Sequence, residues 1–358
     1  MLMIWAFLIN IEHQKMIEFG SDFHSCEDNF IKNTSCFKDL VNLRYYASGR
    51  HALEAIIKQE KWERIWIPAY FCYEVIDYIS SLGLEVKFYD DNPLKIDDDY
   101  TVKYLPYKEG DVLLRVNYYG LRNKRSNKEL NIPVIEDHTH SIVSDWVIKS
   151  DADWCVASLR KSLPIACGGL LWSPQKRNVP NQINTSEECE KMAGIRYEAM
   201  RKKAFYLNNG GDKNEFREKY ILSEKMIEEL SLTKMDTKSL NIIETMNIIQ
   251  WFDNRRHNWE ILCTKLSDKF NIIKPLHNEE FYPFSTIILC DSHKEREILR
   301  QYLIENSIYP AILWNLPENS EFSNALDFSK KMLSIHCDAR YTNEDIEKMC
   351  QTINEFYD

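Results

Sequence analysis

Lys161 and the short motif around it have the clearest potential for chemistry in this sequence. The motif reads Ser158-Leu159-Arg160-Lys161, and the paired glycines Gly168-Gly169 follow it. A lysine that forms a Schiff base must be held near a cofactor carbonyl, and a nearby Ser or Arg can bind the phosphate of that cofactor. A single lysine in a loop is usually only solvated. The neighbours of Lys161 are therefore what make it a candidate.

A carboxylate lies about one crossover upstream, where Glu136-Asp137 ends a predicted strand at residues 133–135. A carboxylate at such a strand end can pair with the protonated nitrogen of a pyridine ring, which makes a pyridoxal ring an electron sink. His140 follows three residues later and could contact the phenolate oxygen of the same ring. The alternative is an N-cap aspartate with a surface histidine, and the sequence leaves both interpretations open.

The motif Ser48-Gly49-Arg50 opens a predicted helix and could hold a phosphate. Helix N-termini present unpaired backbone N–H groups and the positive end of a dipole, and a glycine there allows close approach of the anion. Capping by Ser48 alone is the alternative. Further side chains that could line the same cleft follow predicted strands: Tyr70 and Phe71, whose rings could cover a planar cofactor, and Asn117.

The elements that must position these side chains alternate between strands and helices from residue 48 to 175. Short β-rich apolar runs predict strands at 64–67, 85–89, 112–116 and 133–135, separated by helical stretches. This alternation is typical of βαβ units and of a parallel sheet. Because ligands of open α/β sheets bind beyond the carboxyl ends of the strands, we expect the chemistry in the loops there.

The rest of the chain predicts a helical segment followed by a second α/β unit. Residues 186–267 are charged, poor in glycine and helical in pattern, with one break at 208–211. A strand at 285–289, a helix at 295–306, a strand at 331–336 and a helix at 343–357 follow. We therefore expect an N-terminal segment (1–40), a large α/β domain (41–250) and a small C-terminal α/β domain (251–358).

Composition and charge exclude several classes of protein. The chain has 358 residues, of which 44% are hydrophobic and 28% are charged, and this is ordinary globular usage. Its net charge of -10 and the lack of a basic block argue against nucleic-acid binding. The apolar run at residues 1–9 is too short to span a membrane and is interpreted as a packing segment or an artefact of start-site choice. Ten cysteines without a C-x-x-C pair favour free thiols in a reducing cytoplasm.

In their order, these motifs resemble the DegT/DnrJ/StrS family of pyridoxal 5'-phosphate (PLP) sugar aminotransferases. The family's Ser-Gly-Thr corresponds to Ser48-Gly49-Arg50, its Pro-x-Tyr-Thr-Phe to residues 68–72, and its Glu-Asp-x-x-His/Gln to residues 136–140. Tyr119-Gly120 matches a strand end of the family, and Lys161 with Gly168-Gly169 matches its Schiff-base lysine and paired glycines. The resemblance covers residues 40 to 355, including Arg255-Arg256 and the segments 308–317 and 333–345 in the C-terminal half.

The resemblance implies a fold, a cofactor and a reaction. The fold is the type I aminotransferase fold, in which a large, mostly parallel sheet domain with helices on both faces is followed by a small C-terminal α/β domain. The cofactor is PLP, held covalently by Lys161, with Asp137 on its ring nitrogen and further contacts from Ser48, Gly49, Arg50, Tyr70, Phe71, Asn117, His140 and Ser158. The reaction is transfer of an amino group from glutamate to a keto sugar carried on a nucleotide, for surface-polysaccharide synthesis. The protein would be a cytoplasmic homodimer with its sites at the subunit interface.

Several positions depart from the family pattern. Arg50 replaces the threonine of Ser-Gly-Thr, which exchanges a hydroxyl contact to the phosphate for a guanidinium. The family's Ser-Phe-x-x-Thr-Lys is shortened to four residues at 158–161, and Cys167 replaces an acidic residue before the paired glycines. Cys72 stands where the ring-stacking phenylalanine is expected, which leaves Tyr70 or Phe71 for that role. The Gly-x-Asn-x-Arg-Met segment that reaches the neighbouring subunit is not found in this sequence.

Three other interpretations remain. One is a catalytically inactive or regulatory binding protein with the PLP fold, which the altered phosphate loop and the missing segment favour. A dehydratase is the second, although such relatives carry histidine where this chain has Lys161. A zinc site is the third, but the spacing of its candidate ligands fits structural zinc poorly, so no metal is expected; these ligands are His138, His140, Cys155 and Cys167. The absence of a G-x-G-x-x-G pattern argues against dinucleotide binding.

Overall fold

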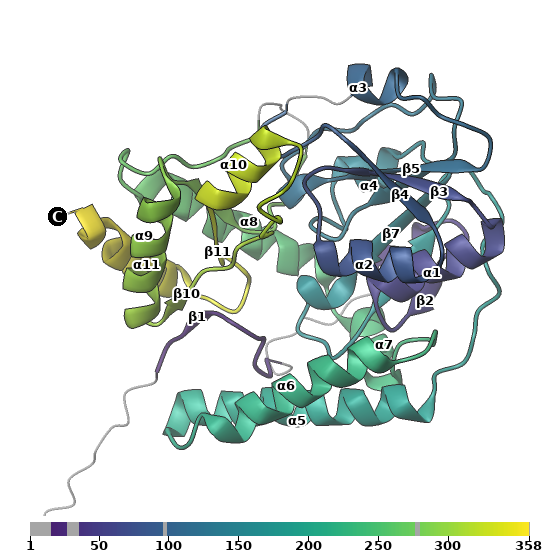
Figure 1. The fold of residues 1–358 in the computed structure, drawn as a ribbon. Helices are drawn as coiled ribbons and strands as arrows, with labels where there is room; N and C mark the ends of the chain where they lie inside the picture. Colours follow the sequence, from purple (N-terminus) through teal and green to yellow (C-terminus); the bar gives the residue numbers. More distant parts are fainter. Residues whose placement is uncertain (1–15, 27–35, 96–98, 276–279, 358) are drawn as a thin grey trace, which may run out of the picture.

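The computed structural model describes residues 16–26, 36–95, 99–275 and 280–357 (Figure 1). A large α/β part lies on one side of the molecule, the C-terminal elements lie on the other, and the paired helices α5 and α6 run below them. The apolar run at residues 1–9 lies outside the described residues. None of the described helices combines the length and the apolar character that a membrane span requires.

A seven-stranded sheet forms the centre of the large part, in the order β2-β8-β7-β6-β5-β3-β4. Its strands are β2 (Arg44–Tyr46), β3 (Arg64–Pro68), β4 (Glu85–Tyr89), β5 (Asp111–Val116), β6 (Val134–Asp137), β7 (Trp154–Ser158) and β8 (Gly169–Trp172). Strands β4, β3, β5, β6 and β7 pair in parallel, whereas β8 runs antiparallel to both β7 and β2. The predicted, mostly parallel α/β sheet is confirmed.

Both faces of this sheet are buried, because successive residues of its strands belong to two different hydrophobic cores. In β3, for example, Ile65 and Ile67 belong to one core and Trp66 belongs to the other. Side chains of α1 (Gly49–Glu60) and α2 (Tyr73–Ser81) complete the first core, and α4 (Asp145–Lys149) and α5 contribute to the second. Such continuous burial is typical of parallel strands that are covered on both faces.

The segment that the sequence predicts as helical contains α5 (Glu187–Asn209), α6 (Asn214–Glu229), α7 (Thr237–Thr245) and α8 (Ile248–Lys265). Helices α5 and α6 lie side by side as a hairpin (Figure 1), and its turn passes through Gly210, which has a φ of +76°. The shorter elements are α3 (Asp99–Lys103) and the 3-10 turns η2 (Cys36–Asp39), η3 (Tyr118–Gly120) and η4 (Leu159–Lys161). The predicted break at 208–211 is therefore confirmed as the hairpin turn.

The C-terminal residues form the second α/β unit that the sequence predicts. Its elements are β9 (Thr286–Leu289), α9 (His293–Glu305), β10 (Ile308–Tyr309), α10 (Ser323–Lys331), β11 (Met332–Ile335), α11 (Asn343–Asn354) and η5 (Glu355–Tyr357). Strand β9 pairs antiparallel with β11, and β10 pairs in parallel with β1 (Phe19–Gly20) of the N-terminal segment. Ile287 and Leu299 share the core of α1 and α2, so this unit packs against the large part. The domain boundaries at 40 and 250 stay a prediction.

Candidate active site

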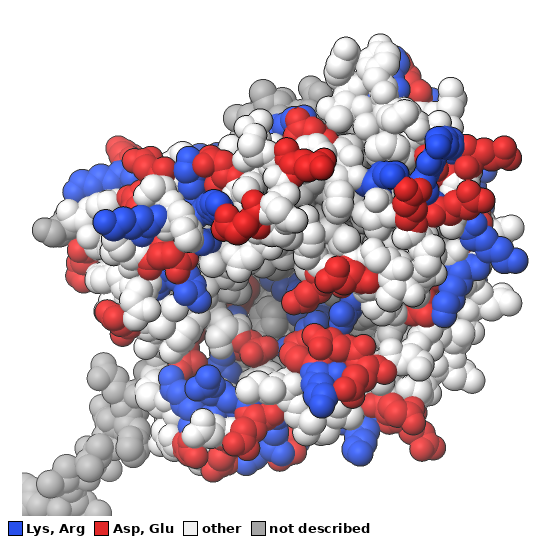
Figure 2. Space-filling view, viewed as in Figure 1, with Lys and Arg blue, Asp and Glu red and all other residues white. Residues whose placement is uncertain are grey.

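A cavity of about 380 Å³ opens at the carboxyl ends of β5, β6 and β7. All predicted site residues except Tyr70 and Asn117 line it, namely Ser48, Gly49, Arg50, Phe71, Asp137, His140, Ser158 and Lys161. Figure 2 shows a hollow in the middle of the viewed face whose rim carries both acidic and basic side chains. Motifs that are far apart in the sequence therefore meet at the edge of the sheet where ligands of such folds bind.

Lys161 stands at the end of η4, the tight turn that directly follows β7. Its side chain reaches water through the cavity, and its amine makes no hydrogen bond or ion pair with another described residue. The charge of the adjacent Arg160, together with partial loss of hydration inside the cavity, lowers the pKa of Lys161 to about 8. An amine with this pKa is partly uncharged near neutral pH, so it is available as a nucleophile or a base.

Asp137 is the last residue of β6, which extends two residues beyond the predicted strand at 133–135. Its register places it between Val116 on β5 and Val156 on β7, in the middle of the sheet edge. The backbone N–H of Thr139 donates to Oδ1 at 2.8 Å. Burial raises the pKa of Asp137. The carboxylate is thus fixed through one oxygen at the wall of the cavity.

His140 is held as a neutral ring by its neighbours. Its Nδ1 accepts a hydrogen bond from the backbone N–H of Tyr119 at 3.1 Å, so the ring proton resides on Nε2. The imidazole stacks with the rings of Tyr119 and Trp314, whose centroids each lie 5.3 Å from its own. Burial, together with the charge of Lys161, lowers the pKa of His140 to about 3. His140 is therefore a hydrogen-bond donor to the cavity throughout the physiological pH range.

The start of α1 forms one end of the cavity. The Ser48 side chain caps this helix by accepting the N–H of His51 at 3.2 Å, while the first turn of α1 lies against Ser158. A Cβ atom on Gly49 would lie 3.2 Å from the Cβ of Ser158, and one on Gly169 would lie 2.1 Å from the carbonyl oxygen of Ser48. Gly169 is therefore required for the close packing of β8 on the helix start, rather than for contact with a ligand.

Two arginines bring positive charge to this end of the cavity. Arg50 belongs to the first turn of α1 and lies over the ring of Tyr78 at 5.5 Å. Arg160 donates to both carboxylate oxygens of Glu224 at 2.7 and 3.2 Å. With the positive end of the α1 dipole and the hydroxyl of Ser158, these guanidinium groups form a surface suited to an anion such as a phosphate.

Tyr70 and Asn117 lie behind the cavity wall rather than on it. Tyr70 is fully buried, and its hydroxyl is bonded to the hydroxyl of Tyr119 and to the carbonyl oxygen of Leu313. Asn117 is also buried. Its backbone N–H donates to the carbonyl of Asp137 at 3.0 Å, whereas its side-chain amide has no hydrogen-bond partner among the described residues. Phe71, next in sequence to Tyr70, is the aromatic residue of this motif that lines the cavity.

Sequence reasoning missed the acidic residues that line the cavity. Glu224 and Glu228 come from α6, and Glu74 comes from the first turn of α2. No local pattern links a glutamate on a helical hairpin to a lysine turn more than sixty residues earlier. Trp314 lies in the segment 308–317 that the family resemblance had singled out, and it brings the C-terminal part to the cavity.

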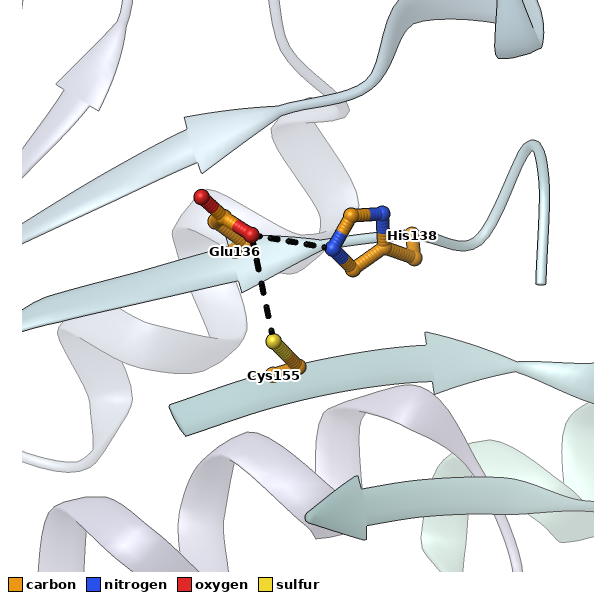
Figure 3. Close-up of side chains that lie close together, drawn as sticks. All are labelled: Glu136, His138 and Cys155. Carbon is orange, nitrogen blue, oxygen red and sulfur yellow. Dashed lines mark hydrogen bonds and ion pairs between the residues drawn. The ribbon is translucent and has the colours of Figure 1, made fainter. Parts of the chain in front are cut away.

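The residues considered for zinc do not come together as a set of four. Figure 3 shows His138 and Cys155 facing the carboxylate of Glu136, with the imidazole Nε2 at 3.1 Å and the thiol at 3.9 Å from it. The two oxygens of Glu136 also accept from Asn127 at 2.8 Å and from Ser150 at 2.6 Å. This buried cluster is a hydrogen-bonded network whose carboxylate is already satisfied. The expectation of no metal stays a prediction.

His140 and Cys167, the other two zinc candidates, have separate places. His140 lines the cavity, and the thiol of Cys167 donates to Asp236 at 3.1 Å. Strand alternation explains why Glu136 and Asp137 differ in role, since successive side chains of β6 point to opposite faces of the sheet. The cluster around Glu136 therefore lies across the sheet from the cavity-lining carboxylate.

The fold is that of several solved aminotransferases. Protein Spr1654 of Streptococcus pneumoniae, described as a sugar aminotransferase and solved in its PLP form, superposes with a TM-score of 0.62 at 13% identity, over 96% of this chain and 98% of that one. A DegT DnrJ EryC1 StrS aminotransferase of Brucella abortus gives 0.59 at 14% identity, over 89% and 87% of the two chains. NtdA of Bacillus subtilis with bound PMP gives 0.59 at 12%, over 88% and 73%.

No known protein family and no curated protein matches the sequence. The structural likeness extends over nearly the whole chain at very low identity, so it shows the fold alone. The predicted type I aminotransferase fold is confirmed. Of the solved proteins that share it, Spr1654 is described as a sugar aminotransferase, and the Brucella abortus protein carries the name of the family that the motifs resemble.

Proposed function

We propose that this protein is a PLP-dependent aminotransferase that acts on a sugar. One observation carries the proposal: three features line the same cavity, namely a lysine amine that has no ion-pair partner among the described residues, a half-buried carboxylate and the N-terminus of a helix. The amine belongs to Lys161, the carboxylate to Asp137, and the helix end to Gly49 and Arg50. These are the three anchors that PLP needs, for its aldehyde carbon, its ring nitrogen and its phosphate.

The residues of the cavity fit the cofactor group by group. The backbone N–H groups at the start of α1, the hydroxyl of Ser158 and the guanidinium of Arg50 would bind the phosphate. The Nε2–H of His140 would donate to the phenolate oxygen. When bound, PLP supplies an electron sink that stabilises negative charge on a substrate carbon. Asp137 would hold the proton on the ring nitrogen, and without that proton the sink is weak.

Lys161 would also have a second role, in proton transfer. Its free Nζ would take a proton from the substrate carbon and return one to the cofactor side, as a general base and then a general acid. Its lowered pKa suits this exchange, because efficient proton transfer needs a group whose pKa lies near the working pH. Trp314 and Phe71, on the walls of the cavity, would limit the access of water.

For the substrates, we propose glutamate as the amino donor and a keto sugar carried on a nucleotide as the acceptor. The sugar is supported by the solved proteins with this fold that are described as sugar aminotransferases. Surface-polysaccharide synthesis in the cytoplasm is the proposed setting, and a homodimer is the proposed assembly. The donor, the nucleotide, the pathway and the assembly are what the resemblance of the motifs to the family implies.

The test is the visible absorption spectrum of the purified protein with added PLP, before and after borohydride reduction, followed by peptide mapping. We expect a yellow protein in which reduction fixes the cofactor at Lys161. Lys161→Ala should bind no cofactor covalently and should have no aminotransferase activity, and an unchanged rate in this variant would refute the assignment. Added glutamate should convert the aldehyde form of the cofactor to its amine form. A protein that takes up PLP but shows no such conversion would instead be a binding protein.

A further inference from the structure

The Arg160–Glu224 ion pair forms part of the cavity wall. Both terminal nitrogens of Arg160 bind the carboxylate of Glu224, at 2.7 and 3.2 Å, in the bidentate geometry that gives strong, oriented pairs. Glu224 also accepts from Arg196 at 2.7 Å, and Arg196 binds Asp22 at 2.9 Å. The carboxylate of Glu224 is thus bound by two arginines.

This pair lines the same cavity as the amine assigned to the reaction. Arg160 and Lys161 are neighbours in η4, and both side chains line the cavity. Glu224 partly neutralises Arg160, yet it makes no ion pair with Lys161. A direct ion pair would stabilise the ammonium form of the lysine, and this arrangement avoids it.

Other charged or titratable groups also face Lys161 across the cavity. They are Arg50 on α1, Cys72 and Glu74 at the start of α2, Asp137 on β6, His140 after it, and Glu228 on α6. Among the charged influences on Lys161, Arg160 acts most strongly against the ammonium form and Glu224 most strongly in its favour. Arg160 and Glu224 are thus the two charged groups of the cavity wall whose opposed effects on the amine are largest, and they are bound to each other.

We propose that the Arg160–Glu224 pair sets the pH at which the amine of Lys161 becomes nucleophilic. Arg160 destabilises the ammonium form of Lys161. Glu224 binds the guanidinium of Arg160 and cancels part of the effect of its charge on the amine. The inference rests on the proposed function only for the statement that Lys161 is the reacting amine. It assigns the α5–α6 hairpin a part in the chemistry, because Glu224 is the residue through which α6 acts on the lysine turn.

The test measures the pH dependence of Lys161 acetylation in the full-length protein after removal of carbonyl compounds with hydroxylamine. Acetic anhydride is the probe, mass spectrometry of the Lys161 peptide is the readout, and the exposed Lys176 is the internal reference. We expect a wild-type midpoint near pH 8. Arg160→Gln should raise this midpoint and slow acetylation at pH 7 by about tenfold or more. Glu224→Gln should lower the midpoint and speed acetylation at pH 7 by about threefold to tenfold.

Two controls separate this effect from a structural one. Glu229→Gln removes a neighbouring carboxylate of α6 that is exposed and pairs only loosely with Lys225 at 3.9 Å; it should leave the Lys161 midpoint unchanged. Arg160→Lys keeps the positive charge and should stay near the wild-type midpoint. If Glu224→Gln fails to fold, as judged by circular dichroism, the test rests on the two Arg160 variants. The midpoint of Lys161 acetylation should then be higher in Arg160→Gln than in Arg160→Lys.

The proposal is overturned if Arg160→Gln titrates like the wild type, or if Glu224→Gln folds and its midpoint moves upward or not at all. The assay contains neither cofactor nor substrate. A protein that never binds PLP could therefore still show the expected shifts, and a working aminotransferase could lack them. Failure of this inference and failure of the proposed function are thus distinguishable.

Discussion

Replacing Gly169 by alanine tests how the cavity is built, because the expected effect follows from one backbone contact. A Cβ atom at this position would lie 2.1 Å from the carbonyl oxygen of Ser48 and 2.8 Å from the backbone nitrogen of Gly49. Both contacts are backbone atoms that cannot rotate away, so β8 or the start of α1 must move. Overpacking of this kind costs about 1–3 kcal/mol. The helix end that lines the cavity is displaced at the same time.

The matched control is Gly194→Ala, which makes the same chemical change in the interior of α5. A Cβ at Gly194 would meet no atom within 4 Å. Alanine there should stabilise the protein by about 0.5–1 kcal/mol, because glycine is the poorer helix former. In urea unfolding followed by circular dichroism, the midpoint should fall for Gly169→Ala and rise for Gly194→Ala, and PLP affinity should weaken only in Gly169→Ala. A Gly169→Ala protein with wild-type midpoint and PLP affinity would refute the reasoning.

The same structure predicts the effects of three other substitutions. Ile56→Ala removes a fully buried side chain of α1 and should lower the free energy of unfolding in urea by about 2–5 kcal/mol. Tyr119→Phe removes the hydroxyl that donates to the carbonyl of Leu313 at 2.6 Å and should cost about 0.5–1.5 kcal/mol by the same measurement; equal stability would show that this bond contributes nothing. Burial opposes ionisation of Glu224, but nearby cations lower its pKa to about 2. The carboxylate therefore stabilises the fold above pH of about 4.3 and loses this effect as the pH falls toward 2, so the stability difference between the wild type and Glu224→Gln should close over that range.

The sequence predicts the elements of this fold well where the hydrophobic period is regular. The strand at Glu85–Tyr89 and the helix that begins at Gly49 appear where predicted. Strands β7 and β8 were missed, because each is a short apolar run that periodicity cannot distinguish from a loop or a buried helical turn. The end of β6 was placed two residues too early, since Glu136 and Asp137 are polar and strand prediction favours apolar residues.

The candidate site was predictable only as far as the topology brings local motifs together. Asp137 ends β6 and Lys161 follows β7, and these strands pair in parallel, so the two residues meet at one sheet edge. The sequence places both residues near strand ends or in loops, but their pairing depends on β7, which it does not reveal. Tyr70 and Phe71 could not be told apart in sequence, and packing against the C-terminal part sends Tyr70 behind the wall. Glu224 lies on a helical hairpin whose position relative to the sheet depends on tertiary packing, and no spacing in the sequence indicates that position.

Backbone contacts at the start of β8 explain why two glycines follow Lys161 in the sequence. The N–H of Gly168 donates to the carbonyl of Ala47 at 2.8 Å, just before the start of α1, and its own carbonyl accepts the N–H of Leu159 at 2.9 Å, at the start of the lysine turn. One residue thus links the helix end to the turn that carries Lys161, and the next, Gly169, lets the two approach. A cofactor anchored at its phosphate and at its aldehyde carbon needs a fixed distance between those anchors. Since this distance is set by backbone hydrogen bonds rather than by side chains, Gly169→Ala should weaken PLP binding more than its loss of stability alone would explain.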